Sequence, residues 1–204
     1  MKTVDIGKYN TMAAFGIIIL LPGLLDPTQL SRNQFSLLVS FIGFILFSVA
    51  MYKYSKIFNN SHIMKSYLIT IGLSLIAGFF PELLLATVND SGYNTSENLI
   101  NLIINISFIG IYISAIAALF FTKKYLLELY KHLKHKLFKI TAWIYFSAGV
   151  ILINLLGIQM IFSHSNSDIE ENLLIMLTKL LTLIVSILLV IAFFKVPDLV
   201  EVPE

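Results

Sequence analysis

Six long apolar segments follow one another along the chain, separated by short polar or charged stretches. The segments are Tyr9–Leu25, Phe35–Tyr54, Met64–Val88, Leu99–Phe121, Phe138–Phe162 and Asn172–Phe194. A helix that crosses a bilayer needs about 20 mainly apolar residues. The strict alternation of membrane β-strands is absent from these segments, and runs of this length favour helices. The pattern predicts an all-α polytopic membrane protein in which residues 1–204 form one domain, a bundle of six transmembrane helices.

The composition agrees with lipid as the main solvent of the chain. Hydrophobic residues make up 57% of the sequence and charged residues only 13%, whereas a soluble protein carries about 25% charged residues. Too few charged side chains are present to cover a water-soluble particle of this length. The chain has no cysteine, which excludes disulfides, thiolate metal ligands and cysteine nucleophiles.

The lysines gather on one side of the predicted bundle. Every lysine except Lys179 lies in or next to the stretch before the first segment, between the second and third, between the fourth and fifth, or after the sixth. The opposite gaps carry Arg32 and several acidic residues. Because lysine and arginine in short loops mark the cytoplasmic side, both termini are expected to be cytoplasmic in a multi-pass protein of the cell membrane.

The one strongly basic run, Thr122–Lys139, predicts a cytoplasmic, basic, amphipathic extension between the fourth and fifth helices. Its apolar residues recur at helical spacing: Leu126, Leu129, Tyr130, Leu133 and Leu137. Such a helix either lies on the anionic inner leaflet or, as we favour, is a solvated extension of the fourth span that follows the positive-inside rule. The lysines predicted to contact lipid head groups are Lys123, Lys124, Lys131, Lys134, Lys136 and Lys139.

Two ionisable residues, Glu82 and Lys179, lie within predicted spans. Charges there are costly, so they usually face the bundle and find partners. Helical rise places Glu82 about 9 Å and Lys179 about 10 Å below the outer helix ends. Asn105 and Asn154 reach similar levels, and Asn101 lies one turn above Asn105. We expect Glu82 and Lys179 to form a buried ion pair that Asn105 and Asn154 complete to a polar cluster. This cluster is either a binding or proton-handling site or, as we favour, structural: an interhelical clasp, or a Lys179 that snorkels to the interface.

A short internal repeat relates the second and fourth segments, because Ser40–Gly43 and Ser107–Gly110 share the sequence Ser-Phe-Ile-Gly. It suggests a parallel repeat of two helical hairpins. Small residues four apart, such as Ser74 and Gly78, predict close helix contacts. The tail Val196–Glu204 is short and acidic and contains two prolines, so we expect a frayed end.

Motifs that carry chemistry are missing from the sequence: no Walker loop, GxGxxG, GxSxG or haem-attachment pattern occurs. We therefore expect no enzyme, no metal and no cofactor. The expected partners are membrane lipids and other integral membrane subunits, not nucleic acid. The main hypothesis is a non-catalytic or accessory membrane component. The alternative is a small-solute transporter or substrate-binding component that uses the polar cluster, and an intramembrane enzyme ranks last.

One stretch carries a resemblance to a known family. Within Ser40–Gly78, an Ile-Gly pair is followed by the exit Ala-Met-Tyr-Lys-Tyr-Ser-Lys and then by an Asn-Asn loop. In these features the chain resembles an uncharacterised family of small multi-pass membrane proteins of prokaryotes, well represented in archaea. The resemblance implies an integral membrane protein of about this length and supplies no catalytic residue. In size and span count, the chain is also similar to the six-helix substrate-capture subunits of vitamin transporters.

Overall fold

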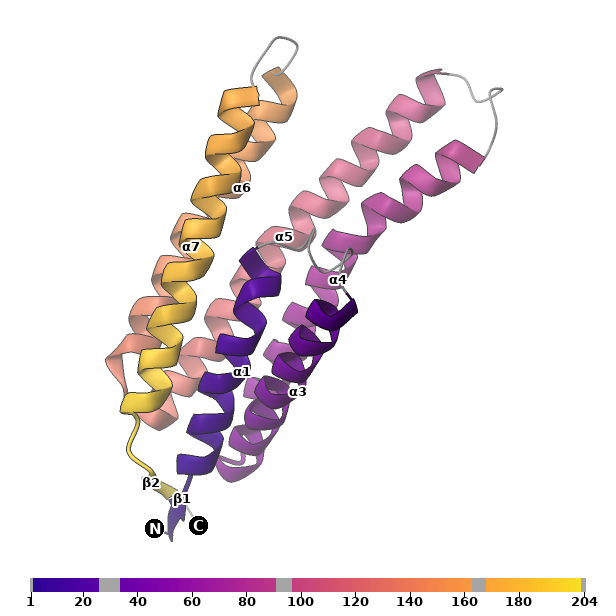
Figure 1. Ribbon diagram of the computed structural model, residues 1–204. Coiled ribbons are helices and arrows are strands. Elements are labelled where there is room, and N and C mark those ends of the chain that lie inside the picture. The colour runs from indigo at the N-terminus through magenta and orange to yellow at the C-terminus, as the bar shows by residue number, and fades with distance from the viewer. Residues whose placement is uncertain (1, 26–33, 91–96, 163–167, 203–204) are drawn as a thin grey trace.

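The predicted apolar segments all form helices in the computed structural model (Figure 1). The backbone is described for residues 2–25, 34–90, 97–162 and 168–202, and side chains for residues 2–22, 35, 38–77, 107–155 and 173–202. The helices are α1 (Gly7–Leu25), α3 (Gln34–Ile57), α4 (Ser61–Asp90), α5 (Glu97–Leu133), α6 (Lys136–Phe162) and α7 (Asp168–Lys195). Two short strands, β1 (Lys2–Asp5) and β2 (Leu199–Val202), lie at the chain ends.

The helices of the described residues form a closed ring in which neighbours along the chain are also neighbours in space. α1 packs against α3 and α7, α4 packs against α3 and α5, and α6 packs against α5 and α7. The α4–α5 and α6–α7 hairpins extend beyond α1 and α3 and diverge away from the termini (Figure 1). We call the opposite end, formed by residues 2–10, 53–65, 122–142 and 193–202, the lysine-rich end.

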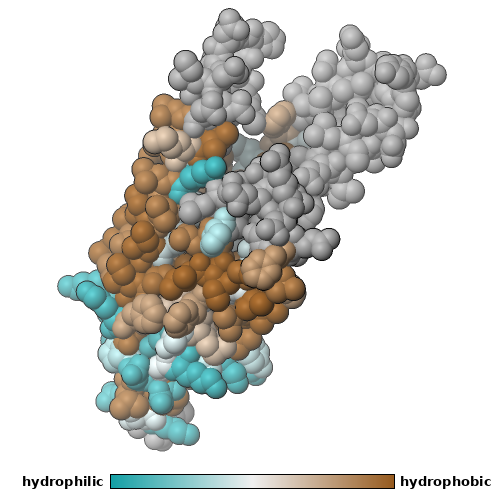
Figure 2. Space-filling model, in the orientation of Figure 1, coloured by the Kyte–Doolittle hydropathy of each residue, from teal (hydrophilic) through white to brown (hydrophobic). Residues whose placement is uncertain are grey.

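Within the described part of the chain, four helices contain a stretch long and apolar enough to cross a membrane. These stretches are Leu38–Ile57, Ser107–Leu133, Lys136–Leu155 and Leu173–Lys195. At most 33% of the most apolar window of each is buried, so most of the hydrocarbon faces outward. Figure 2 shows this hydrophobic surface next to the more hydrophilic lysine-rich end. The stretches indicate a membrane location, whereas membrane crossing by α1 and α4 stays a prediction.

The basic run continues the fourth apolar segment as one helix. α5 extends without a break to Leu133, the chain turns at Lys134 with a left-handed φ of 52°, and α6 begins at Lys136. On the extension, Leu126, Leu129 and Leu133 are buried in the core. The protein itself therefore covers the apolar face, which favours a solvated extension over a helix that lies flat on a leaflet.

The two chain ends pair as a small antiparallel sheet, so the expectation of a frayed tail is wrong for residues 199–202. The register aligns Lys2 with Val202 and Asp5 with Leu199. Val202 and Ile6, the residue that follows β1, are both buried. These apolar side chains anchor the sheet on the bundle and offset the marginal stability of an isolated two-stranded ribbon.

Aromatic side chains fill the ring interior at the lysine-rich end. Tyr54 of α3, Phe138 of α6 and Phe193 of α7 are 0% exposed. The Phe193 ring centroid lies 4.9 Å from that of Phe138 in an edge-to-face contact and 6.0 Å from that of Tyr54 in a stacked contact. Phe47 adds an edge-to-face contact with Phe193 at 6.2 Å. This aromatic plug joins α3 to α6 and α7, which are not its neighbours in the ring.

The helices α1 and α3 approach each other closely at Gly16 and Gly43. A Cβ on Gly16 would lie 2.8 Å from the Phe47 backbone nitrogen and 2.9 Å from the Gly43 carbonyl oxygen. Glycine permits this approach, and close packing is what holds helices together in lipid. A Cβ on Gly110, the counterpart of Gly43 in the predicted repeat, would meet no atom within 4 Å. The two copies of the repeat therefore pack differently at this position.

Candidate functional site

The predicted intramembrane cluster is described only in part. Glu82, Asn101 and Asn105 lie outside the residues whose side chains the structure describes. Lys179 of α7 and Asn154 of α6 are exposed. The structure therefore leaves the Glu82–Lys179 ion pair a prediction.

The Asn154 side chain links α6 to α5. Its Oδ1 accepts a hydrogen bond of 2.8 Å from the Tyr112 hydroxyl, and its Nδ2 donates one of 2.7 Å to the Val150 carbonyl oxygen. Both bonds connect helices or helical turns that are already adjacent. At this position the arrangement is that of an interhelical clasp.

Several lysines of the basic run lie against aromatic rings. The Lys123 ammonium is 3.5 Å from the ring centroid of Trp143 and 4.3 Å from that of Phe146. The Lys139 ammonium is 5.9 Å from the ring centroid of Tyr130. A cation over an aromatic face is attracted by the ring quadrupole. These contacts hold α5 and α6 together where the apolar surface meets the lysine-rich end.

The other lysines of the run project more freely. The Lys124 ammonium is 5.9 Å from the Phe121 ring centroid. Lys131 is 63% exposed and forms a 2.7 Å ion pair with Glu128. The remaining exposed lysines of the run are Lys134 and Lys136. Contact of these six lysines with lipid head groups stays a prediction.

Asn60, in the turn between α3 and α4, fastens that turn to α5. Its Oδ1 accepts a 3.0 Å hydrogen bond from the His62 backbone N–H and so caps α4. Its Nδ2 donates to Glu128 Oε2 and lies within hydrogen-bond distance of His132 Nε2, each at 3.0 Å. The His132 ring stacks on Phe58 at a centroid distance of 4.6 Å.

The helix cap determines which end of the Asn60 side-chain amide faces α5. Because Oδ1 is held by the His62 N–H, the NH₂ group faces α5 and donates there. His132 Nε2 must then accept, which places the imidazole proton on Nδ1. The sequence signal for this site was the Asn-Asn pair before a helix start, a common capping pattern; its partners on α5 had no signal of their own.

A second polar pair is buried deeper in the bundle. The Tyr54 hydroxyl donates a 2.6 Å hydrogen bond to Asn10 Oδ1, and Asn10 Nδ2 donates one of 3.4 Å to the Val196 carbonyl oxygen. Tyr54 and Asn10 are both buried. The pair ties α1 to α3 and to the residue that follows α7.

Taken together, the polar groups of the lysine-rich end hold helices to one another. Among the described side chains, no three His, Asp or Glu residues gather as metal ligands. Two buried polar atoms in the same part of the chain, His135 Nδ1 and Thr141 Oγ1, lack a hydrogen-bond partner. They lie at the start of α6 and one turn into it.

Comparison with known proteins places most of the chain in one family. Residues 39–163 match a family described as "Protein of unknown function (DUF996)". The match runs from α3 to α6 and includes the stretch Ser40–Gly78, which carried the resemblance noted from the sequence. No curated protein and no solved structure matches the chain.

Proposed function

We propose, from the premise that the chain belongs to the DUF996 family of unknown function, that it is a non-catalytic integral membrane protein and an accessory component of a larger membrane assembly. It crosses the bilayer six times, with both termini in the cytoplasm. Its partners are membrane lipids and other integral subunits. The lysine-rich end then lies at the inner leaflet, where anionic lipids attract each nearby lysine by about 1 kcal/mol.

The observation that carries this proposal is how the lysine-rich end uses its polar groups. Asn60 engages Glu128 and His132, and Asn10 engages Tyr54. A catalytic acid or base has to face a space that a substrate enters, whereas these groups face one another across helix contacts. Their arrangement supports a role in packing.

The outer surface supports the proposed partners. Only 17% of the most apolar window of α7 is buried, and 22% of that of α6. These helices thus present broad hydrocarbon faces to their surroundings. Lipid chains and the apolar helices of other subunits both match the polarity of such faces. Native mass spectrometry distinguishes these two kinds of partner.

The accessory role is tested by purifying the tagged protein from its native host in a mild detergent and weighing it by native mass spectrometry. The expected result is a complex in which other membrane proteins are present in a fixed stoichiometry. A folded monomer that carries only lipid would overturn the accessory role and leave the membrane location standing.

The orientation is tested by cysteine labelling, since the native chain has no cysteine. Asn94→Cys and Lys136→Cys are each exposed, in intact cells, to a maleimide that does not cross membranes. We expect Asn94→Cys to react at once and Lys136→Cys to react only after the membrane is opened. Reaction of both in intact cells contradicts the six spans, and the reverse pattern contradicts the orientation.

A small-solute transporter or substrate-binding component is the second candidate. It is favoured by the divergence of the α4–α5 and α6–α7 hairpins (Figure 1), on which Asn154 and Lys179 are exposed. If water fills this region, Asn154→Cys and Lys179→Cys react with an impermeant maleimide, while Ile184→Cys, on the exposed apolar surface of α7, does not. Equal protection of all three positions argues against a transporter.

A further inference from the structure

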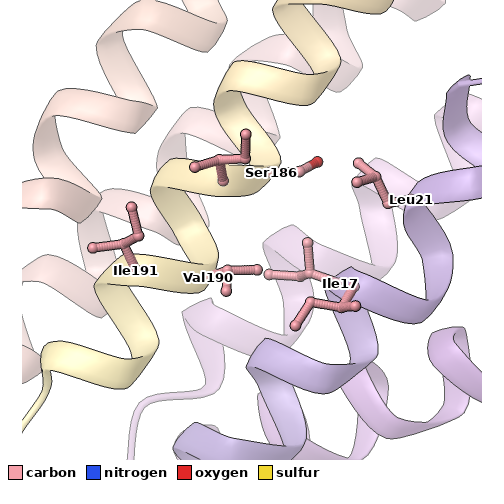
Figure 3. Close-up of a pocket in the computed structure, with 7 residues that line it drawn as sticks. Ile17, Leu21, Ser186, Val190 and Ile191 are labelled. Atoms are coloured by element: carbon pink, nitrogen blue, oxygen red, sulfur yellow. The ribbon is translucent and has the colours of Figure 1, made fainter.

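A small apolar cavity lies between α1 and α7 (Figure 3). Its volume is about 130 Å³, and it is lined by Ile17, Ile18 and Leu21 of α1 and by Ser186, Ile187 and Val190 of α7. Ile18 and Ile187 are exposed, so the cavity opens to the outer surface of the bundle. Apolar cavities of about this size stay dry and accept hydrocarbon.

Ser186 creates much of this space. It is the one small residue in a wall of branched aliphatic side chains, and it is only 6% exposed. Its hydroxyl points from α7 toward α1 (Figure 3). Thr182, one turn earlier, bonds a carbonyl of its own helix at 2.9 Å, whereas Ser186 makes no hydrogen bond with any described residue. The cavity is therefore not closed by a polar contact between α1 and α7.

Lys179 lies on the same face of α7 as Ser186, seven residues earlier. Positions i and i+7 share a helix face, and seven residues span about 10 Å along the axis. Lys179 is exposed and makes no ion pair or hydrogen bond with the part of the chain whose side chains are described. A lysine in a lipid-facing helix needs an anion or the interface. The α7 surface thus combines a cation that has no partner among the described side chains with an open hydrocarbon slot.

We propose that this surface binds an anionic phospholipid, with the phosphate at Lys179 and a short segment of one acyl chain in the cavity beside Ser186. The charge selects an anionic head group, and the dry, aliphatic walls select a chain. A free solute of the same charge would fill only the upper half of the site. The inference goes beyond the proposed function and holds for either orientation of the protein in the membrane.

The competing partner of Lys179 is Glu82, the predicted counter-ion. Glu82 belongs to α4, which packs against α3 and α5, while α7 packs against α1 and α6. The two helices therefore lie in different parts of the ring. This separation favours a lipid phosphate over the Glu82 carboxylate as the anion at Lys179.

The test uses the full-length protein in phosphatidylcholine nanodiscs doped with phosphatidylglycerol that carries a diazirine in one acyl chain. After illumination, cross-linked residues are mapped by peptide mass spectrometry. We expect cross-links within residues 17–21 and 183–190, and competition by unlabelled phosphatidylglycerol but not by added phosphatidylcholine. Lys179→Gln is expected to weaken apparent affinity about tenfold, the effect of losing one charge-assisted contact.

Three further variants sharpen the result. Ser186→Leu fills the cavity and should abolish the cross-links there. Lys195→Gln removes a lysine from the opposite end of the same helix and should leave them unchanged, as should Glu82→Gln. Size-exclusion chromatography checks that each variant folds, and Lys179→Gln serves as the test should Ser186→Leu fail to do so.

Three outcomes would overturn the proposal. Equal competition by the two lipids would remove the role of charge, as would full cross-linking in folded Lys179→Gln. Stronger cross-linking in Glu82→Gln would show that Lys179 is normally paired with Glu82 and that the lipid only replaces it.

Discussion

The lysine-rich end and the apolar stretch of the helices beyond it are held together in different ways. At the lysine-rich end, Tyr54 and Asn10 share a buried hydrogen bond and Phe193 packs among other aromatic rings. Beyond it, large apolar side chains such as Ile109 and Ile113 point outward. Polar groups there often bond within their own helix, as Thr178 does with the Leu174 carbonyl oxygen.

This difference follows from the solvent. Lipid tails are as apolar as leucine, so hydrophobicity alone does not drive helices together in the bilayer, whereas close packing and interhelical hydrogen bonds do. The lysine-rich end has both. We therefore expect substitutions there to change the free energy of unfolding far more than equal substitutions on the outward apolar faces.

The largest expected effect comes from the adjacent pair Phe193 and Phe194. Phe193 is 0% exposed in the aromatic plug, and Phe194 is 54% exposed. Phe193→Ala should lower the free energy of unfolding by about 3–5 kcal/mol, the cost of a large buried aromatic. Phe194→Ala, the matched control, should cost about 1 kcal/mol, since it loses mainly an edge-to-face contact with Phe15. SDS titration followed by circular dichroism measures the free energy of unfolding of both variants. Equal losses in the two variants would contradict the proposed difference between the two regions.

The next effect concerns the two glycines of the short repeat. A Cβ on Gly43 would lie 2.9 Å from the Gly16 carbonyl oxygen and from the Leu20 backbone nitrogen, while one on Gly110 would meet open space. Gly43→Ala should cost about 3 kcal/mol, the upper end for overpacking, because backbone atoms have to move. Gly110→Ala should be neutral or slightly stabilising, since alanine favours a helix. The same SDS titration serves, and a neutral Gly43→Ala would mean that α1 and α3 are farther apart.

A smaller effect is expected from the buried hydroxyl. Tyr54→Phe leaves Asn10 Oδ1 without its donor and should cost about 1.5 kcal/mol. Tyr52→Phe, on an exposed tyrosine two residues away, is the control and should change the free energy by less than about 0.5 kcal/mol. The double variant Tyr54→Phe with Asn10→Leu should lose less free energy of unfolding than the two single variants lose in sum, because each single change breaks the same bond. Additive costs would show that the bond does not contribute.

The sequence predicted the helices well and their partners poorly, for one physical reason. Hydropathy and helical spacing are properties of each segment by itself, so the positions of the helices and the continuation of α5 beyond Phe121 followed directly from them. The contacts of Asn60 with Glu128, or of Gly16 with Gly43, depend on which helices are neighbours. No local pattern encodes the order of the ring, and Ser74, expected at a helix contact, is exposed.

The candidate site shows the same limit. Lys179 and Asn154 were predicted as site residues because polar residues are rare in apolar segments, and this rarity is visible in the sequence itself. The partner of Asn154 is Tyr112, which looks like an ordinary apolar-segment residue in the sequence. The pairing of β1 with β2 joins the two ends of the chain, and strands of four residues leave too little alternation to be recognised.

The smallest expected effect lies at the border between the two regions, at Lys123. Its ammonium stands 3.5 Å from the ring centroid of Trp143, the one tryptophan of the chain. Lys123→Met keeps the length of the side chain and removes the charge, so it should cost about 0.5–1 kcal/mol, the value of an exposed cation–π contact. The fluorescence of Trp143 reports the charge directly. Its emission should shift in Lys123→Met and stay unchanged in Lys139→Met, where the lysine faces Tyr130. An unshifted spectrum would place the ammonium away from the ring, among the lipid head groups.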